Sequence, residues 1–411
     1  MIGEKSKVPS ESFKFTGAAG HALAARLERP IGPIRAVAVF AHCFTCTMQS
    51  HAATRLTAAL ARTGIATLRF DFTGLGGSDG DFGNAGFAAD VADIIAAADH
   101  LRATIEAPSI LIGHSLGGAA VLAAAAGVPE AKAVVTIGAP FDAAHVLHQI
   151  DGDWDRIERE GEGDVRIASR PFKVSRNFLH AVQGVEPERR IAALGRALLV
   201  LHAPRDATVG IENARLIYDA ARHPKSFVSL DDADHLLTRL ADAEYAANLI
   251  AAWVARYLPP LATPVLDEGA VRVSNGAGKW GTLIEAGAHR WIADEPRKLA
   301  GEDAGPSPYD LLLASLGACT SMTLKFYAER EGIALDKVTV MLSHNRNHAQ
   351  DCDHCEEGGT RIEAIDRTVS LTGDLSAEDR ARLMVIADKC PVHKTLTGDL
   401  HIHTRAAEPG E

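Results

Sequence analysis

Three residues far apart in the sequence have the types needed for nucleophilic catalysis: Ser115, Asp206 and His235. Ser115 stands in GHSLG (113–117), a G-x-S-x-G pattern whose glycines allow a tight strand-to-helix turn that exposes the serine hydroxyl. The N–H of Leu116, at the start of the following helix, could bind the negative oxygen of a tetrahedral intermediate. A nucleophilic serine needs a base, and the base needs an acid to orient it. Asp206 and His235 follow later apolar runs in the required chain order, so we expect them to fill these roles.

Cys319 and Cys390 could support thiol chemistry. Cys319 lies inside an apolar run, and Cys390 precedes a proline with Lys389 and His393 close by in the sequence. Nearby cations lower the pKa of a thiol, and a thiol oxidised to a sulfenic acid needs a second thiol to form a disulfide. The alternative interpretation of Cys319 is a small buried apolar residue.

Two C-x-x-C pairs could bind a metal or act in redox chemistry. Cys43 and Cys46 form one pair, in AHCFTC (41–46). The other pair, Cys352 and Cys355, follows His348 in a loop rich in acidic residues. These three residues could hold zinc, but a second clear pair of ligands is missing. We therefore expect no metal, with zinc on the three as the alternative.

The elements that must position the serine, acid and histidine are strands of a parallel sheet. Between residues 11 and 258, near-continuous apolar runs alternate with longer alanine-rich runs of helical period. Such runs are typical of parallel strands covered on both faces, and the alternation predicts a doubly wound α/β sheet. The predicted parallel strands are 36–42, 65–72, 109–115, 133–139, 196–203 and 225–233, after a leading hairpin over 11–28.

Two stretches interrupt this alternation and divide the chain. Residues 141–195 are charged and rich in glycine, which predicts a small cap inserted over the sheet of a 1–258 domain. Prolines within 259–269 predict a linker. Residues 270–411 follow an α+β order, which predicts a second, smaller domain. Its predicted elements are β segments over 270–292, helices over 308–330 and 376–390, and strands over 335–344, 360–372 and 398–405.

The composition is that of a soluble globular protein of 411 residues with a formal charge of -11. An acidic balance argues against nucleic acid or an anionic membrane as a main partner. The first 15 residues have no apolar core, so we expect no signal peptide and a cytoplasmic protein. In that compartment we expect its six cysteines to be reduced thiols.

Residues 1–258 resemble the α/β-hydrolase family. The resemblance is carried by GHSLG (113–117), DFTGLGGSDG (71–80), APRDATVG (203–210) and DADH (232–235). In that family the loop after the third strand supplies a second N–H to the oxyanion, which implies Phe44 N–H as the partner of Leu116 N–H. Cys43 stands where that loop usually has glycine. Oxyanion binding is the interpretation that we favour for AHCFTC (41–46), with a thiol role as the alternative.

Residues from about 270 to 405 resemble the OsmC/organic hydroperoxide resistance (Ohr) family of thiol peroxidases. The matching features are a Ser-Pro helix start, Gly-Ala-Cys at the helix centre and a later Lys-Cys-Pro. The resemblance implies that Cys319 attacks an organic hydroperoxide and that Cys390 resolves it. It also implies a homodimer formed through this domain, with a lipoyl-type dithiol as external reductant.

The family's peroxidases usually carry a glutamate after the proline, paired with an arginine from the preceding hairpin region. In this chain Tyr309 stands at that position and Asp310 follows, while Arg290, Arg297 or Lys279 could serve as the cation. One step along a helix turns the side chain by about 100°, so Asp310 need not face the thiol.

The sequence therefore predicts a cytoplasmic fusion of two catalysts. The first is a serine hydrolase for a small acyl ester or thioester that needs no cofactor. The second is a hydroperoxide reductase that acts in oxidative stress. The alternative is a hydrolase alone, with the second domain as a redox-silent dimerisation or binding module.

Overall fold

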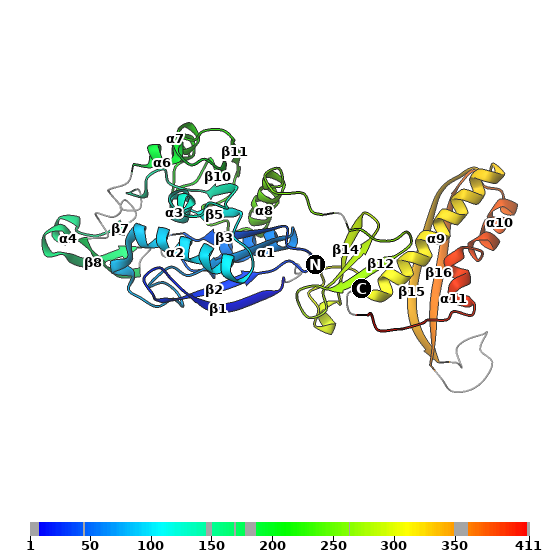
Figure 1. Ribbon diagram of the computed structural model, residues 1–411. Helices are drawn as coiled ribbons and strands as arrows, with labels where there is room; N and C mark the ends of the chain where they lie inside the picture. The colour runs from blue at the N-terminus through cyan, green and yellow to red at the C-terminus, as the bar shows by residue number, and fades with distance from the viewer. Residues whose placement is uncertain are drawn as a thin grey trace. The chain divides into compact units, whose positions relative to one another are not determined.

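The computed structural model describes residues 8–43, 46–144, 150–167, 170–176, 186–262, 264–348 and 361–408. Its contacts divide the chain into two compact units, Met1–Ala304 and Gly305–Glu411 (Figure 1). Each unit is treated separately below.

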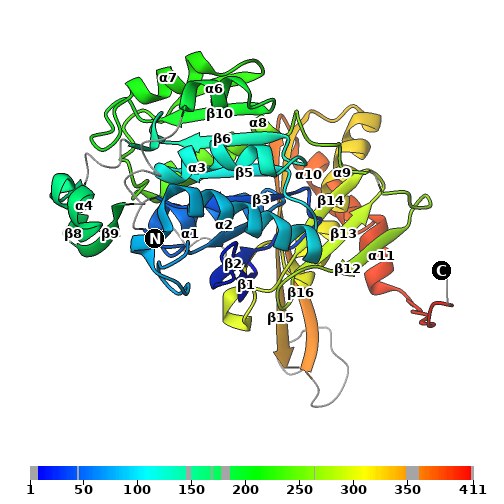
Figure 2. The same cartoon turned by 60° about the vertical axis from the view of Figure 1, so that its left-hand side comes forward.

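The first unit is built on an eight-stranded sheet of order β1-β2-β4-β3-β5-β6-β10-β11 (Figure 2). β1 and β2 form an antiparallel hairpin, and β2 also runs antiparallel to β4. The remaining neighbours are parallel, which confirms the predicted doubly wound α/β sheet with its leading hairpin. The strands are β1 (Ser10–Thr16), β2 (Ala22–Glu28), β3 (Ala36–Ala41), β4 (Ile65–Phe70), β5 (Ile110–His114), β6 (Ala133–Ile137), β10 (Ala197–His202) and β11 (Lys225–Ser229).

Both faces of this sheet are covered by helices, which explains why its central strands are apolar along their whole length. On β3, alternate residues belong to different cores: Val37 and Val39 to one, Ala38 and Phe40 to the other. Helices α2, α3, α6 and α7 contribute to the first core, and α1 and α8 to the second. Their bounds are α1 (His51–Arg62), α2 (Phe82–Thr104), α3 (Leu116–Ala124), α6 (Pro187–Ala192), α7 (Glu212–Ala220) and α8 (Leu240–Val254), with a 3₁₀ turn η1 (Ala125–Gly127) after α3.

The region predicted as a cap lies between β6 and β10 in the chain. It contains a small antiparallel sheet of order β7-β8-β9 and the helix α4 (Trp154–Glu160). Ile157, Val165 and Val174 are buried and join the core formed with α2 and α3. The strands are β7 (Ile150–Asp151), β8 (Glu162–Ile167) and β9 (Arg170–Ser175).

A three-stranded meander follows the predicted linker, in which the described residues form no helix or strand. It consists of β12 (Val271–Asn275), β13 (Thr282–Ala286) and β14 (His289–Ala293), and a 3₁₀ turn η3 (Arg297–Leu299) comes next. Its contacts group it with the first unit, for example through Ala277 N–H, which donates to Ile31 O at 3.2 Å. That the second domain begins at residue 270 stays a prediction.

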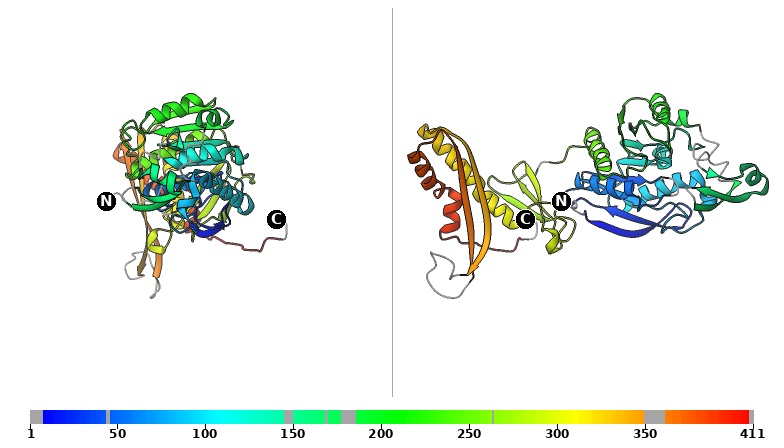
Figure 3. Two further views of the ribbon diagram at one scale, coloured as in Figure 1. Left: turned by 90° about the vertical axis from the view of Figure 1, so that its left-hand side faces the viewer. Right: turned by 180° about the vertical axis from the view of Figure 1, so that it is seen from behind.

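The second unit packs helices against a long antiparallel pair of strands (Figure 3). Leu324 and Ala328 meet Leu383 and Ala387 in its small core. The elements are α9 (Pro308–Glu331), β15 (Leu335–His348), β16 (Arg361–Gly373), α10 (Ala377–Ala387) and α11 (Pro391–Thr397). α9 is long and apolar enough to cross a bilayer, as core helices of soluble proteins also are.

The predicted end of the second domain is wrong in two details. The helix predicted over 376–390 exists as α10 but ends at Ala387, and the helix α11, which begins at Pro391, was not predicted. Residues 398–408 form no strand, although 398–405 were predicted as one. A strand exists only where another strand completes its hydrogen bonds, and these residues have no such neighbour in the described part of the chain.

Candidate active site

Ser115 occupies a strained turn between β5 and α3. Its backbone angles are φ 55° and ψ -126°, in a region that side-chain-bearing residues rarely adopt. The flanking glycines are required, because a Cβ on Gly113 would lie 2.1 Å from Gly117 O, and one on Gly117 would lie 2.4 Å from Ala41 O. The turn therefore holds the serine at the carboxyl end of the sheet, as the G-x-S-x-G pattern predicts.

Asp206 and His235 lie at the carboxyl ends of β10 and β11 and are hydrogen-bonded to each other. Asp206 Oδ2 is 2.7 Å from His235 Nδ1, and Asp206 Oδ1 accepts from Thr208 N–H at 2.8 Å and Val209 N–H at 2.9 Å. Burial raises the pKa of Asp206, but the hydrogen bonds from His235, Val209 and Thr208 outweigh burial, so the pKa lies below its usual value. A charged Asp206 keeps the proton of a neutral His235 on Nδ1, which leaves Nε2 free to act as a base.

Two buried histidines hold this pair in place, and sequence reasoning gave them no role beyond packing. His114 Nε2–H donates to the backbone oxygen of His235 at 2.6 Å, so the residue before Ser115 fixes the histidine loop. Burial, aided by repulsion from His235, lowers the pKa of His114 to about 4, so its ring is neutral at pH 7. His202 Nε2–H donates to Val209 O at 2.8 Å, and burial lowers the pKa of His202 as well.

Gly138 lies next to the side chains of Asp206 and His235. Its φ is +54°, and a Cβ there would lie 3.2 Å from Asp206 Oδ2 and 3.3 Å from His235 Nδ1. Among the described residues, no hydrogen bond joins Ser115 Oγ to the His235 ring. Such bonds often form only with substrate present.

Phe44, the predicted second oxyanion donor, lies outside the described residues, whereas Leu116 is the first residue of α3. A small cavity is lined by His42, Cys43, Asp90 and Leu116, among others. The loop after β3 and the start of α3 therefore border the same space, as an oxyanion site requires.

Cys43 and Cys46 form a disulfide, so the expectation that all the cysteines are reduced thiols is wrong for this pair. Their Cα atoms are 5.3 Å apart, within the range that a disulfide requires, and Cys46 N–H donates to Cys43 O at 3.1 Å. Cys43 is not among the described non-glycine residues with positive φ. The backbone at Cys43 thus does not need the glycine that is usual there.

In the second unit, Cys319 and Cys390 lie next to each other, as thiol chemistry between them requires. Cys319 is partly exposed on α9, and Cys390 is buried at the start of α11. Cys390 Sγ accepts from His393 N–H at 3.3 Å and lies 3.6 Å from Thr320 Oγ1. Burial raises the pKa of the Cys390 thiol, but the hydrogen bonds from His393, Thr320 and Cys319, aided by Arg367, outweigh it and lower the pKa.

The residues predicted to assist these thiols have other contacts. Asp310 forms a capping box with Ser307 at the start of α9, and its Oδ2 accepts from Ser307 Oγ at 2.7 Å. The Tyr309 ring stacks on His344 with centroids 4.1 Å apart. Arg290 pairs with Glu285 at 2.8 Å in the first unit. Arg297, in η3, belongs to the same unit, so a role for either arginine beside Cys319 stays a prediction.

The alternative zinc site falls mostly outside the described residues. Cys352 and Cys355 are not described, and His348 is described only as the last residue of β15. Elsewhere in the described chain, no group of three or more candidate ligands comes together.

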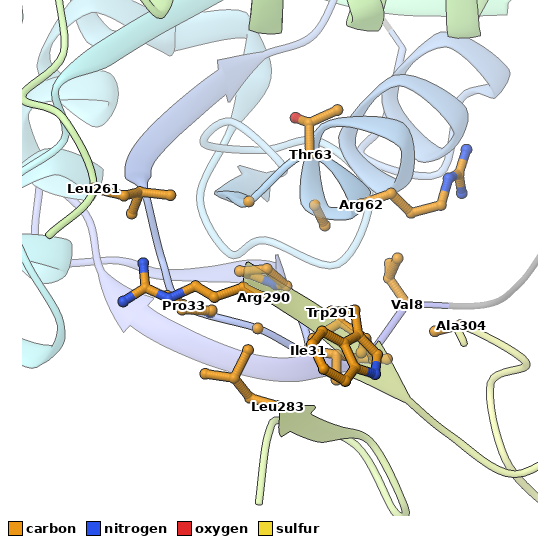
Figure 4. Close-up of a pocket in the computed structure, with 15 residues that line it drawn as sticks. Val8, Ile31, Pro33, Arg62, Thr63, Leu261, Leu283, Arg290, Trp291 and Ala304 are labelled. Carbon is orange, nitrogen blue, oxygen red and sulfur yellow. The ribbon is translucent and has the colours of Figure 1, made fainter. Parts of the chain in front are cut away.

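A second cavity, of about 480 Å³, lies in the first unit at the opposite end of the sheet (Figure 4). Pro33 and Gly64, which line it, precede β3 and β4, whereas Ser115 follows the carboxyl end of β5. Trp291 and Arg290 of β14 also line it. This cavity shares no residue with the Ser115 site.

Comparisons with known proteins match the two parts of the chain to two different families. Residues 32–157 match the family model "Serine aminopeptidase, S33", and residues 301–405 match "OsmC-like protein". The esterase domain of a Rhodothermus marinus protein is 46% identical over 60% of this chain and 98% of that chain, with a TM-score of 0.51. No curated protein matches the sequence.

Two more distant structures share the fold of the first unit. Est1E of Butyrivibrio proteoclasticus, solved with ferulic acid, is 20% identical over 60% of this chain and 98% of that one, with a TM-score of 0.51. The hypothetical protein PA2218 of Pseudomonas aeruginosa is 18% identical over 62% and 96%, with a TM-score of 0.52. The doubly wound sheet, the turn at Ser115 and the likeness to the esterase domain define the first unit as an α/β hydrolase. The chain belongs to the α/β-hydrolase family and is a fusion of such a hydrolase with an OsmC-like domain.

Proposed function

We propose that the first unit hydrolyses small acyl esters or thioesters through Ser115, Asp206 and His235. The observation that carries this proposal is the hydrogen-bonded pair of Asp206 and His235 at the same sheet edge as the strained Ser115 turn. The likeness to an esterase domain supports an ester as substrate.

In this mechanism His235 Nε2 takes the proton of Ser115 as the hydroxyl attacks the acyl carbon. Asp206 stabilises the imidazolium that forms, and Leu116 N–H donates to the developing oxyanion. The bond between the acyl carbon and the oxygen or sulfur of the leaving group then breaks, and His235 gives its proton to the leaving alcohol or thiol. Water, activated by the same histidine, hydrolyses the acyl-enzyme.

The test is hydrolysis of p-nitrophenyl acetate by the full chain and by a Ser115→Ala variant. We expect Ser115→Ala to abolish turnover, while Ser12→Ala, an exposed serine on β1, leaves it unchanged. Activity in Ser115→Ala equal to that of the unmodified chain would overturn the proposal.

We also propose that Cys319 and Cys390 reduce organic hydroperoxides, with a lipoyl-type dithiol as reductant and no metal. The adjacency of the two sulfurs and the OsmC-like match support this proposal. Cumene hydroperoxide should remove two free thiols per chain, and in the Cys319→Ser variant the remaining Cys390 thiol should not be lost. The competing function, a redox-silent module, is favoured by the use of Asp310 in a helix cap. Hydroperoxide consumption by Cys319→Ser equal to that of the unmodified chain would support it.

We propose a homodimer through the second unit, with a second copy of the chain covering its exposed apolar side chains. Met322 and Phe326 on α9 and Met341 on β15 are 69%, 68% and 66% exposed, and exposed large apolar residues often mark an interface. Light scattering should give twice the chain mass, and Phe326→Glu should shift the protein towards monomer. A monomer at micromolar concentration would refute it.

A further inference from the structure

Arg367 of β16 connects three elements around the buried Cys390. Its Nη1 donates to Thr320 Oγ1 on α9 at 3.0 Å and to Ala387 O at the end of α10 at 3.2 Å. Its Nη2 pairs with Asp388 Oδ1 at 2.5 Å. Thr320 Oγ1 in turn lies 3.6 Å from Cys390 Sγ. A cation is thus linked to the sulfur through one hydroxyl group.

The Thr320 hydroxyl can serve both protonation states of Cys390. In the present arrangement its proton is directed to Leu316 O at 2.8 Å, and its oxygen can accept from the Cys390 S–H. When Cys390 is a thiolate, rotation of the hydroxyl turns that proton to the sulfur. Arg367 Nη1 donates to the same oxygen in both states and polarises the hydroxyl, which strengthens it as a donor.

The charged and titratable groups near Cys390 come from every neighbouring element. α9 supplies Cys319, and β16 supplies Arg367, whose charge is partly offset by Asp388 at the end of α10. α11 supplies the His393 N–H. The positive charge of Arg367 lowers the pKa of the Cys390 thiol.

The two thiols differ in access to solvent. Cys390 is 0% exposed, whereas Cys319 is partly exposed, so a hydroperoxide would meet Cys319 first. A buried sulfur that is stabilised as a thiolate suits the second step of the reaction, in which one cysteine attacks the other.

We propose that Arg367 and Thr320 are positioning residues that keep Cys390 a thiolate for the resolving step. The inference rests on the proposed peroxidase function. First, the Cys319 thiolate attacks the distal peroxide oxygen, the O–O bond breaks, and the alcohol leaves with a proton from solvent. Cys390 then attacks the sulfur of the Cys319 sulfenic acid. An S–S bond forms, the S–O bond breaks, and the hydroxide takes up a proton to leave as water.

The test compares single turnovers of the full chain with variants that interrupt the connection. Thr320→Val keeps the shape of the buried side chain and removes the hydroxyl, and Arg367→Met removes the charge. Arg380→Met, an exposed arginine on α10 that bonds Leu371 O, is the matched control. With one equivalent of cumene hydroperoxide, oxidation of Cys319 should proceed at an unchanged rate in all variants. Disulfide formation at pH 7 should slow by roughly tenfold in Thr320→Val and Arg367→Met, because each loses a hydrogen bond that stabilises the charged sulfur.

Two readouts separate this role from a merely structural one. Dimedone should trap more Cys319 sulfenic acid in the two variants, and the pH midpoint of disulfide formation should move upward. Arg367→Lys should restore part of the rate, because it keeps the charge. Disulfide formation within twofold of the unmodified chain in both variants, across the pH series, would overturn the inference.

A chain that consumes no hydroperoxide would refute the peroxidase proposal by itself, and a second measurement would then decide this inference. The thiolate absorbance of Cys319→Ser minus that of Cys319→Ser/Cys390→Ser gives the titration of Cys390 alone. Adding Thr320→Val to Cys319→Ser should move that titration to higher pH. An unmoved titration would refute a stabilised Cys390 thiolate.

Discussion

Replacing His114 with glutamine should remove a defined part of the acid sensitivity of the hydrolase unit. His114 is 1% exposed and donates to His235 O at 2.6 Å. Its pKa falls from 6.5 to about 4, first because of burial and then because of repulsion from His235. Glutamine keeps an N–H donor for the carbonyl but does not titrate.

The size of the effect follows from proton linkage. When unfolded, His114 binds a proton below about pH 6.5, whereas the folded protein binds it only below about pH 4. Between these values the unfolded chain holds more protons, so the free energy of unfolding falls as the pH falls. A difference of about 2.5 pKa units at about 1.4 kcal/mol per unit makes this loss about 3 kcal/mol by pH 4. In the His114→Gln variant this part of the loss in unfolding free energy should be absent.

The assay is urea unfolding of the full chain between pH 7.5 and pH 4.5, followed by tryptophan fluorescence. All four tryptophans belong to the first unit, so the signal reports that unit alone. His289→Gln, on the exposed part of β14, is the matched control. His42 and His202, whose pKa values burial also lowers, remain in every variant. An identical pH dependence in His114→Gln and in the unmodified chain would refute the reasoning.

Three further changes test the Ser115 site through hydrolysis of p-nitrophenyl acetate. Asp206→Asn should lower kcat by about 10⁴-fold, because an amide does not hold the His235 tautomer that serves as base, and a loss below about tenfold would contradict this. Gly138→Ala should lower kcat by roughly 10²-fold and leave the circular dichroism spectrum unchanged, since the new Cβ would lie 3.2 Å from Asp206 Oδ2 and displace it. Reducing Cys43–Cys46 should lower kcat by up to about 10²-fold, the value of one oxyanion donor, and Cys43→Ser/Cys46→Ser should match the reduced enzyme. Equal kcat before and after reduction would show that the loop holds its shape without the disulfide.

Much of the hydrolase fold could be predicted because its signals are local. A strand buried on both faces is a continuous apolar run, and such runs predicted every parallel strand of the sheet. The strained turn at Ser115 leaves a pattern within five residues. Asp206 and His235 could be placed because the carboxyl ends of parallel strands share one edge of the sheet.

What could not be predicted depends on contacts between distant segments. His114 and His235 are 121 residues apart, so no spacing rule indicates that one donates to the other. The Cys43–Cys46 bond is local, but composition alone indicated reduced thiols, and only the positions of Cys43 and Cys46 in the structure show that the two sulfurs meet. Residues 398–405 have a strand-like composition, yet a strand also needs a neighbour that sequence cannot supply.

The second unit shows why a family pattern locates a nucleophile better than its supporting charges. Cys319 and Cys390 could be identified because each lies in a short recognisable stretch. Asp310 was a candidate for the same reason, but a carboxylate three residues after Ser307 is also the third position of a capping box, and that is how it is used. Arg367 lies 47 residues from Thr320, on a strand with no motif of its own, and only the packing of β16 against α9 brings them together. If an upward shift of the Cys390 titration appears in Arg367→Met and not in Asp310→Asn, the charge that serves these thiols comes from the strand rather than from the helix start.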